Sequence, residues 1–219
     1  MVAIVLRTRG EFDRMLRAFH DYDPSILGYY SPRSNRIITY DQTEGRSKDK
    51  LWLFNAGTIL HEATHQTAFN TGLHSRFGPV VRWESEGLAM LFEARGVNNS
   101  QNFPRQGDRI HASRLSQLMK LYQQGEVQGK MAELAVSNDL FRTNAQAAYA
   151  ISWGMTFYFS ETMPDNYKQF LKNDAARTDF SSYSRRQRSA DFAKAFGGNF
   201  KELEARMKRF YQELKQPGR

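Results

Sequence analysis

Two histidines four residues apart, with a glutamate directly after the first, stand in the segment TILHEATHQTAF, Thr58 to Phe69. On a helix, positions i and i+4 lie one turn apart on the same face. His61 and His65 can therefore direct both imidazoles at one metal ion, at nitrogen–metal distances of about 2.0–2.1 Å. Glu62 is rotated by about 100° from His61, which places it to accept a proton from a water on that ion. The spacing predicts a metal centre with its own general base.

Chance does not account well for this pattern. The chain has five His and twelve Glu among 219 residues, so an accidental HExxH match is expected roughly 0.006 times per chain. The alternative, that both histidines make ordinary polar contacts on a helix, stays open at this point. The chain has no Cys, so thiolate ligands and disulfides are excluded, and a metal must use His and carboxylate ligands.

A catalytic zinc site has three protein ligands and one open position. The downstream segment RWESEGLAMLFEARG, residues 82–96, offers three carboxylates on one expected helix, and spacing alone does not choose among them: Glu84, Glu86 and Glu93. The remaining histidines have no ligand-like spacing and are expected at the surface or in polar parts of the core: His20, His74 and His111.

The segments HEATHQ and WESEGLA together resemble the gluzincin zinc metallopeptidases of the peptidase MA-like superfamily, in which HExxH is followed by Trp-x-x-Glu-Gly-x-Ala. In that family, the glutamate before the glycine is the third zinc ligand. The resemblance therefore implies a Zn²⁺ cofactor held by His61, His65 and Glu86, with Glu62 as the catalytic base. Glu84 stands where the family has a non-ligand residue.

A second resemblance lies in AAYAISWGMTFYFSE, Ala147 to Glu161. It is similar to the Tyr-x-x-Gly helix of the aminopeptidase N group, whose tyrosine donates a hydrogen bond to the oxyanion of the tetrahedral intermediate. The resemblance implies this catalytic role for Tyr149, with Ser152 in place of the glycine. A tyrosine on an aromatic helix is otherwise more often a core residue, and both roles stay open.

Most of the chain resembles an uncharacterised bacterial family of gluzincin-type peptidases. The aminopeptidases carry a Gly-x-Met-x-Asn strand before HExxH, whereas this chain has GYYSPRSN, residues 28–35. This departure favours an endopeptidase over an aminopeptidase, with a peptide or protein as its substrate. The thermolysin-like aspartate four residues after the third ligand is also missing, because Met90 occupies that position.

The elements that must position these residues are predicted from periodicity and turn signals. Strands are expected at Val2–Arg7 and as a hairpin within Gly28–Asp41, and helices over residues 11–20 and 50–70. A helix from Trp83 is expected to end near Gly96, and the chain after residue 109 is expected to be helical. The strand Arg36–Tyr40 pairs with an extended peptide if it lies at the sheet edge, and is otherwise a core strand.

These elements predict an α+β fold, and the resemblance implies that it is zincin-like. A small N-terminal sheet with the active-site helix precedes a mostly helical C-terminal half. We expect one gluzincin-like catalytic domain over residues 1–219, with the sheet and active-site helix in 1–81 and a helical subdomain in 82–219.

The formal net charge of +8 raises the question of a polyanionic partner. The basic residues are dispersed, with the densest groups at Ser184–Arg188 and Arg206–Phe210, and no nucleic-acid recognition motif accompanies them. No specific nucleic acid is therefore expected, while attraction to an anionic surface or to acidic substrates stays open. No apolar run approaches eighteen residues, which predicts the absence of a transmembrane segment.

Two alternatives to a peptidase stay open at the level of sequence. One is a catalytically silent zinc-binding gluzincin scaffold used for protein interaction, and the other is a basic protein that binds nucleic acid or an anionic surface. The start MVAIVLRTRGEF lacks the pattern of a signal peptide, so we expect a cytoplasmic protein or a trimmed form of an exported one. The oligomeric state is not predicted.

Overall fold

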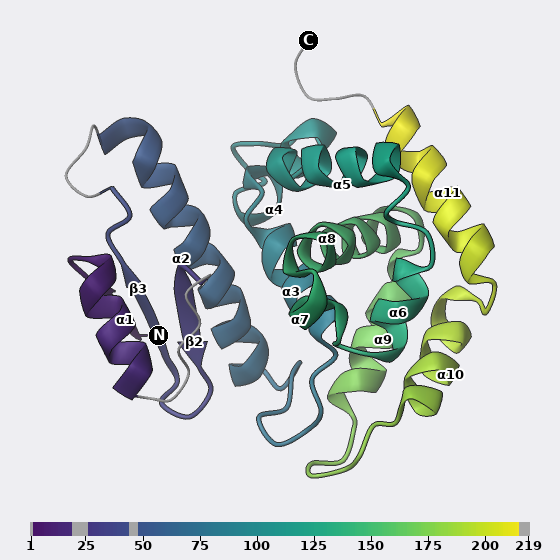
Figure 1. Cartoon of the computed structure of the whole chain (residues 1–219), viewed down its shortest axis with the longest axis horizontal. Helices are drawn as coiled ribbons and strands as arrows, with labels where there is room; N and C mark the ends of the chain where they lie inside the picture. The colour runs from purple at the N-terminus through teal and green to yellow at the C-terminus, as the bar shows by residue number, and fades with distance from the viewer. Residues whose placement is uncertain (1, 19–25, 44–47, 215–219) are drawn as a thin grey trace. The chain divides into compact units, whose positions relative to one another are not determined.

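The computed structural model describes residues 2–18, 26–43 and 48–214 and divides into two compact units, Met1–Thr71 and Gly72–Arg219 (Figure 1). The first unit contains a small sheet with helices, and the described part of the second is helical. The predicted α+β class, with a small N-terminal sheet before a mostly helical half, is thereby confirmed. The boundary between the units falls after Thr71, whereas the sequence suggested a boundary after residue 81.

The sheet of the first unit has the strand order β1-β3-β2. Strand β1 (Val2–Leu6) pairs in parallel with β3 (Arg36–Tyr40), and β2 (Gly28–Ser31) pairs with β3 in antiparallel register. In the turn between β2 and β3, Asn35 has a positive φ of 54°, which Asn tolerates better than most residues. Because β3 is the central strand of this sheet, Arg36–Tyr40 is a core strand, the second of the two alternatives that the sequence left open, and it does not form a peptide-binding edge.

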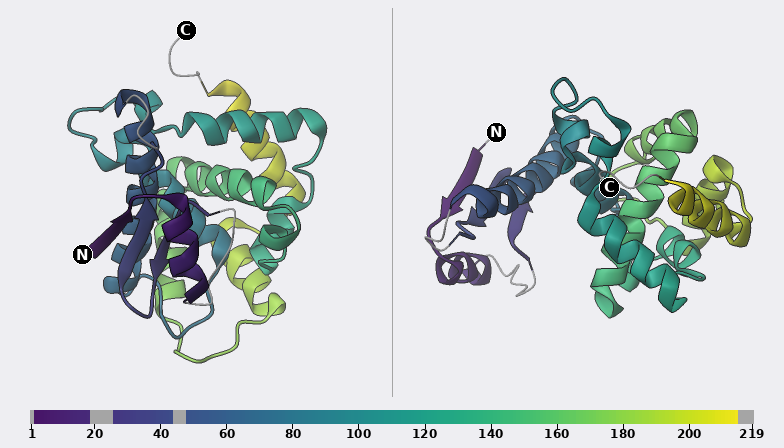
Figure 2. Two further views of the ribbon diagram at one scale, coloured as in Figure 1. Left: turned by 60° about the vertical axis from the view of Figure 1, so that its left-hand side comes forward. Right: turned by 90° about the horizontal axis from the view of Figure 1, so that it is seen from above.

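Helices α1 (Arg9–Ala18) and α2 (Lys48–Asn70) cover opposite faces of this sheet (Figures 1 and 2). Successive side chains of a strand point to opposite faces, and Ile38 of β3 accordingly joins Phe12 and Leu16 of α1 in a small core. On α2, the side-chain amide of Gln66 donates to the carbonyl oxygen of Asn35 at 2.6 Å. This hydrogen bond fixes α2 against the turn of the β2–β3 hairpin. The predicted end of α1 at residue 20 lies outside the described residues.

The second unit is built around α8 (Ala145–Thr162), which runs through the middle of its helices (Figure 1). From Ala147 to Phe159, nearly every residue of α8 is buried. The other elements are α3 (Arg82–Phe92), α4 (Arg95–Asn98), the 3-10 turn η1 (Gln106–Arg109), α5 (Ala112–Gln124), α6 (Lys130–Val136), α7 (Leu140–Thr143), α9 (Pro164–Ala175), α10 (Arg185–Phe196) and α11 (Phe200–Glu213). Within the described ranges, no helix combines the length and apolar character needed to cross a membrane.

The close crossing of α3 and α8 depends on Gly87. A Cβ atom at this position would overlap Oγ1 of Thr156 and would lie 2.8 Å from the carbonyl oxygen of Ser152. Such contacts are shorter than folded proteins accept, so a larger residue would push the two helices apart. Gly87 therefore fixes the first half of α3 against α8.

Helix α3 ends at Phe92, and the prediction that Gly96 terminates it is wrong. Ala94 already has an extended backbone, and Gly96 lies inside the short helix α4. A Cβ atom at Gly96 would lie 2.6 Å from the carbonyl carbon of Asp108 and 2.7 Å from the backbone nitrogen of Arg109. The glycine is required because η1 packs directly against α4.

Candidate metal centre

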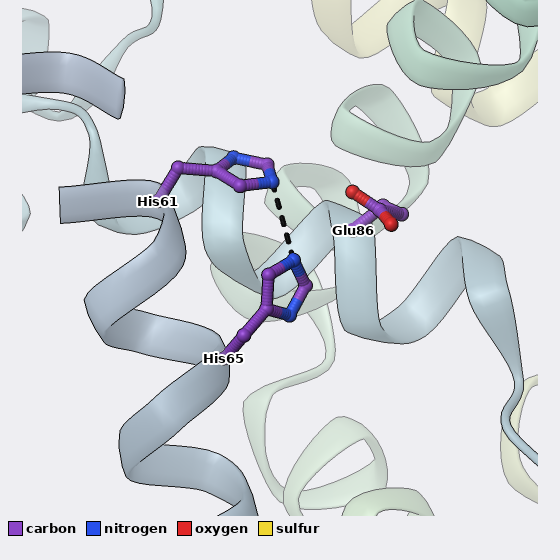
Figure 3. Close-up of side chains that lie close together, drawn as sticks. All are labelled: His61, His65 and Glu86. Carbon is purple, nitrogen blue, oxygen red and sulfur yellow. Dashed lines mark hydrogen bonds between the residues drawn. The ribbon is translucent and has the colours of Figure 1, made fainter. Parts of the chain in front are cut away.

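His61 and His65 lie on adjacent turns of α2, with their Nε2 atoms 3.2 Å apart (Figure 3). Their rings meet at 77°, with the centroids separated by 4.8 Å. Two ligands on one tetrahedral zinc ion, each about 2.0–2.1 Å from it, lie about 3.4 Å from each other. The structure therefore brings the two predicted histidine ligands together in a geometry that an ion can occupy with little rearrangement.

Glu62 follows His61 and belongs to the face of α2 that packs on the sheet. Its side chain is 8% exposed. A Cβ atom on Gly28 of β2 would lie 3.0 Å from Cγ of Glu62 and 3.2 Å from its Oε1. The absence of a side chain at Gly28 thus lets the start of β2 approach the Glu62 carboxylate closely.

The three candidate carboxylates on and after α3 have different surroundings. Glu84 is fully buried inside the second unit, and this burial raises the pKa of its carboxyl well above the usual range. Glu93 pairs with His111, with 2.9 Å between Oε2 and Nε2. Glu86 is only partly buried, with a side chain that is 13% exposed. Because Glu84 is enclosed within the second unit and Glu93 is paired with His111, these surroundings support Glu86 as the third ligand of an ion at the histidine pair.

Tyr149 on α8 is linked to Glu86 through Arg82, which lies one helical turn before Glu86. Nη2 of Arg82 lies 3.4 Å from the phenolic oxygen of Tyr149, and its Nε lies 3.7 Å from Oε1 of Glu86. The guanidinium also covers the ring of Phe141 at 4.6 Å, and this ring meets that of Tyr149 edge to face at 5.3 Å. Glu86 and Tyr149 therefore belong to one cluster in the second unit.

Sequence reasoning did not identify Arg82 or a second cation, Arg114, whose guanidinium carbon lies 5.4 Å from the ring centroid of Tyr149. Arg82 carried a usable signal, since a basic residue four positions before Glu86 has the spacing of a helical ion pair. Arg114 carried none, because its contact depends on how α5 packs against α8. The two arginines make the surroundings of the phenol electropositive.

The predicted site residues thus fall into two groups. The first unit brings His61, Glu62 and His65 together on α2, and the second unit brings Glu86 and Tyr149 together across α3 and α8. That both groups serve one ion is part of the proposal made below.

Comparison with protein families gives one match. Residues 55–181 match the family described as "protein of unknown function (DUF1570)". Because the match covers more than half of the chain, the protein belongs to this family. The matched segment begins ahead of the HExxH motif and ends after α9, so it includes every predicted site residue. The comparison with curated proteins gives no match, and neither does the comparison with solved structures.

Proposed function

We propose that the protein is a zinc-dependent peptidase whose Zn²⁺ is held by His61, His65 and Glu86. The observation that carries this proposal is the 3.2 Å separation of the two histidine Nε2 atoms, close to the separation of about 3.4 Å for two ligands on one tetrahedral zinc. Two histidines and one carboxylate form a known catalytic zinc ligand set that leaves a fourth position for water or substrate. The zincin-like fold, on which this proposal also draws, rests on the sequence resemblance to gluzincins.

Glu62 accepts a proton from the water that attacks the peptide carbonyl carbon. When bound, Zn²⁺ acidifies water and polarises a carbonyl group. A general base must stay within hydrogen-bond reach of the proton that it takes, and the burial of Glu62 close to Gly28 restricts the positions that its carboxylate can adopt. The same carboxyl group then returns the proton to the amine that leaves the cleaved peptide bond.

Tyr149 and Arg82 stabilise the negative charge that develops on the peptide oxygen. The phenolic hydroxyl donates a hydrogen bond to that oxygen, as donors of an oxyanion hole do. Arg82 lies 3.4 Å from the phenolic oxygen and therefore adds positive charge beside the donor. Arg82 also approaches Glu86, so it positions both residues of this cluster.

An extended peptide is the substrate class that the first unit can accommodate. Within the described residues, β2 pairs only with β3 and is therefore an edge strand, the kind of strand to which an extended peptide can add, and three of its four residues are buried. This edge begins at Gly28, directly beside Glu62. Since the chain lacks the Gly-x-Met-x-Asn strand of aminopeptidases, we propose cleavage at internal bonds.

Removal and return of the metal tests this function. Zinc-loaded protein, chelator-stripped protein and zinc-restored protein are each incubated with a diverse peptide library, and the products are identified by mass spectrometry. We expect internal cleavage by the loaded and restored samples and none by the stripped sample. Cuts confined to the N-terminal residue would instead indicate an aminopeptidase. A folded, zinc-loaded protein that cleaves no peptide would favour the silent zinc-binding scaffold.

A further inference from the structure

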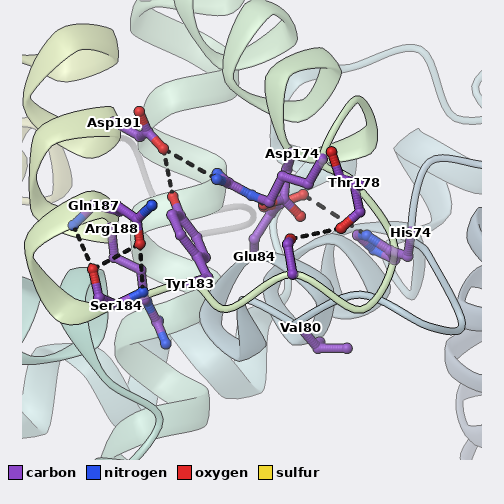
Figure 4. Close-up of polar contacts among 12 residues, drawn as sticks. His74, Val80, Glu84, Asp174, Thr178, Tyr183, Ser184, Gln187, Arg188 and Asp191 are labelled. Atoms are coloured by element: carbon purple, nitrogen blue, oxygen red, sulfur yellow. Dashed lines mark hydrogen bonds and ion pairs between the residues drawn. The ribbon is translucent and has the colours of Figure 1, made fainter.

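A second cluster of metal-ligating side chains lies inside the helical unit, on residues that the proposed peptidase site does not use. His74 comes from the loop before α3, Glu84 from α3 and Asp174 from α9 (Figure 4). One ligand atom from each lies within 4.8 Å of the others. The three residues are 5%, 0% and 9% exposed. The cluster is therefore closed to bulk solvent and has three different potential ligands.

Glu84 is the reason to expect an occupant. Among the described residues, neither oxygen of its carboxylate has a hydrogen-bond partner, although the side chain is fully buried. A buried polar group in this state needs a physical explanation, and a bound water or ion is one of the few that apply. Oε1 of Glu84 lies 3.9 Å from Nδ1 of His74, too far for a hydrogen bond but close to the separation of two ligands on one ion.

The arginines near the cluster do not satisfy Glu84. Arg188 donates to two carbonyl oxygens of α6 and to Oδ1 of Asn138. Arg177 donates to Oδ1 of Asp174 at 2.7 Å, which leaves the other oxygen of Asp174 for a further ligand. Both cations offset the negative charge of the cluster from nearby. Neither places a donor on the Glu84 carboxylate, so a positively charged ligand has a role there.

Two buried hydroxyl groups make the surroundings of Glu84 more polar than an ordinary helical core. The Tyr167 hydroxyl and Oγ1 of Thr156 are both buried and interact with each other through a side-chain hydrogen bond. Burial, together with the nearby charge of Glu84, raises the pKa of Tyr167, so this phenol lies in the same polar region. Glu84 therefore shares its buried surroundings with at least one further polar side chain, which makes this region more favourable to an ion than a purely apolar core.

We propose that His74, Glu84 and Asp174 bind a divalent transition-metal cation. One imidazole and two carboxylates suit Zn²⁺, which is bound by nitrogen and oxygen ligands about 2.0–2.2 Å from the ion. Because the cluster is closed and joins the loop before α3 to α9, the ion has a structural role that stabilises the helical unit. This inference is independent of the proposed peptidase activity.

The test uses the full-length His61→Ala/His65→Ala variant, in which the histidine pair of α2 cannot hold metal. After incubation with Zn²⁺ and gel filtration, we expect one zinc per chain by elemental analysis and a higher Tm than for the same variant stripped of zinc. Adding Glu84→Gln, which keeps the side-chain shape but removes the anionic ligand, abolishes both the bound zinc and the zinc-dependent rise in Tm. His74→Gln on the same background gives the same loss.

Glu93→Gln on this background is the matched control, because it removes a nearby carboxylate that pairs with His111 outside the cluster. It should retain the zinc. A folded His61→Ala/His65→Ala protein without zinc would overturn the inference. So would a Glu84→Gln variant that keeps its zinc, since Glu84 would then be a buried carboxyl served by water alone.

Discussion

His61 and His65 approach one point because four residues make slightly more than one helical turn. Glu62, one position after His61, is turned by about 100° and therefore reaches the sheet, where Gly28 leaves space for it. Helix geometry alone therefore points the two histidine ligands in one direction and the base in another. The third ligand and the oxyanion donor depend on other helices and need separate tests.

Glu86→Gln should lose the zinc of the histidine pair and the peptidase activity, because the amide is a much weaker zinc ligand than a carboxylate. Glu93→Gln, about two turns further on at the end of α3, is the control and should keep both. Zinc content by elemental analysis and turnover of a cleaved peptide check the prediction. If Glu86→Gln keeps full activity and the zinc of the histidine pair, Glu86 is not the third ligand.

Tyr149→Phe should lower kcat by roughly 10²-fold, as the loss of one oxyanion donor does. The ring contacts with Phe141 and Arg114 do not need the hydroxyl, and the contact that Arg82 makes with the hydroxyl is long at 3.4 Å, so we expect only a small change in Tm. Tyr158→Phe, on the same helix, is the control for loss of a phenol. Unchanged kcat in Tyr149→Phe would return this residue to a packing role.

At the scale of elements, α3 directs its carboxylates to different environments. Glu84 and Glu86 are two positions apart, which turns them by about 200° around the helix axis. Glu84 is therefore fully buried, while Glu86 remains partly exposed. This division requires α3 to hold one orientation on α8, and Gly87 fixes that orientation.

Gly87→Ala should destabilise the protein by about 1–3 kcal/mol, the usual cost of inserting a methyl group into a tightly packed crossing. Urea unfolding followed by circular dichroism measures the change. Gly10→Ala on α1 is the control, since the nearest atom to its added Cβ lies 3.8 Å away, and it should be neutral or slightly stabilising. Equal losses in the two variants would contradict the role given to the α3–α8 crossing.

At the scale of the whole molecule, the net charge of +8 predicts faster association with acidic substrates at low ionic strength. Two peptides with the same cleaved bond and either acidic or neutral flanks test this. We expect kcat/KM for the acidic peptide to fall as NaCl rises from 0.1 M to 1 M, because the Debye length shrinks from about 10 Å to about 3 Å. The same salt response for both peptides would show that the charge does not select substrates.

The sequence predicted the features that depend on local spacing. The histidine pair is local, because an i, i+4 spacing on a helix is enough to bring the imidazoles together. The prediction that α3 ends at Gly96 was wrong, because Gly96 is needed for contact with η1, which the local sequence does not show. The sequence also did not predict whether β3 is a central or an edge strand, because strand order is set by pairings between distant segments.

The sequence did not predict the buried cluster of the helical unit, because packing between distant segments brings its residues together. His74, Glu84 and Asp174 come from a loop, α3 and α9, and nothing in their spacing relates them. His74 was expected at the surface or in a polar part of the core, and it is buried with a side chain only 5% exposed.

The measurement that tests the central claim most directly is peptide turnover by Glu62→Gln beside the wild type, with zinc content determined on the same samples. Because Glu62 is the proposed base and not a ligand, the variant should keep the zinc of the wild type. Its kcat should fall by about 10²–10⁴-fold, the usual contribution of general acid–base catalysis. A Glu62→Gln protein with wild-type zinc and wild-type turnover would contradict the proposed mechanism.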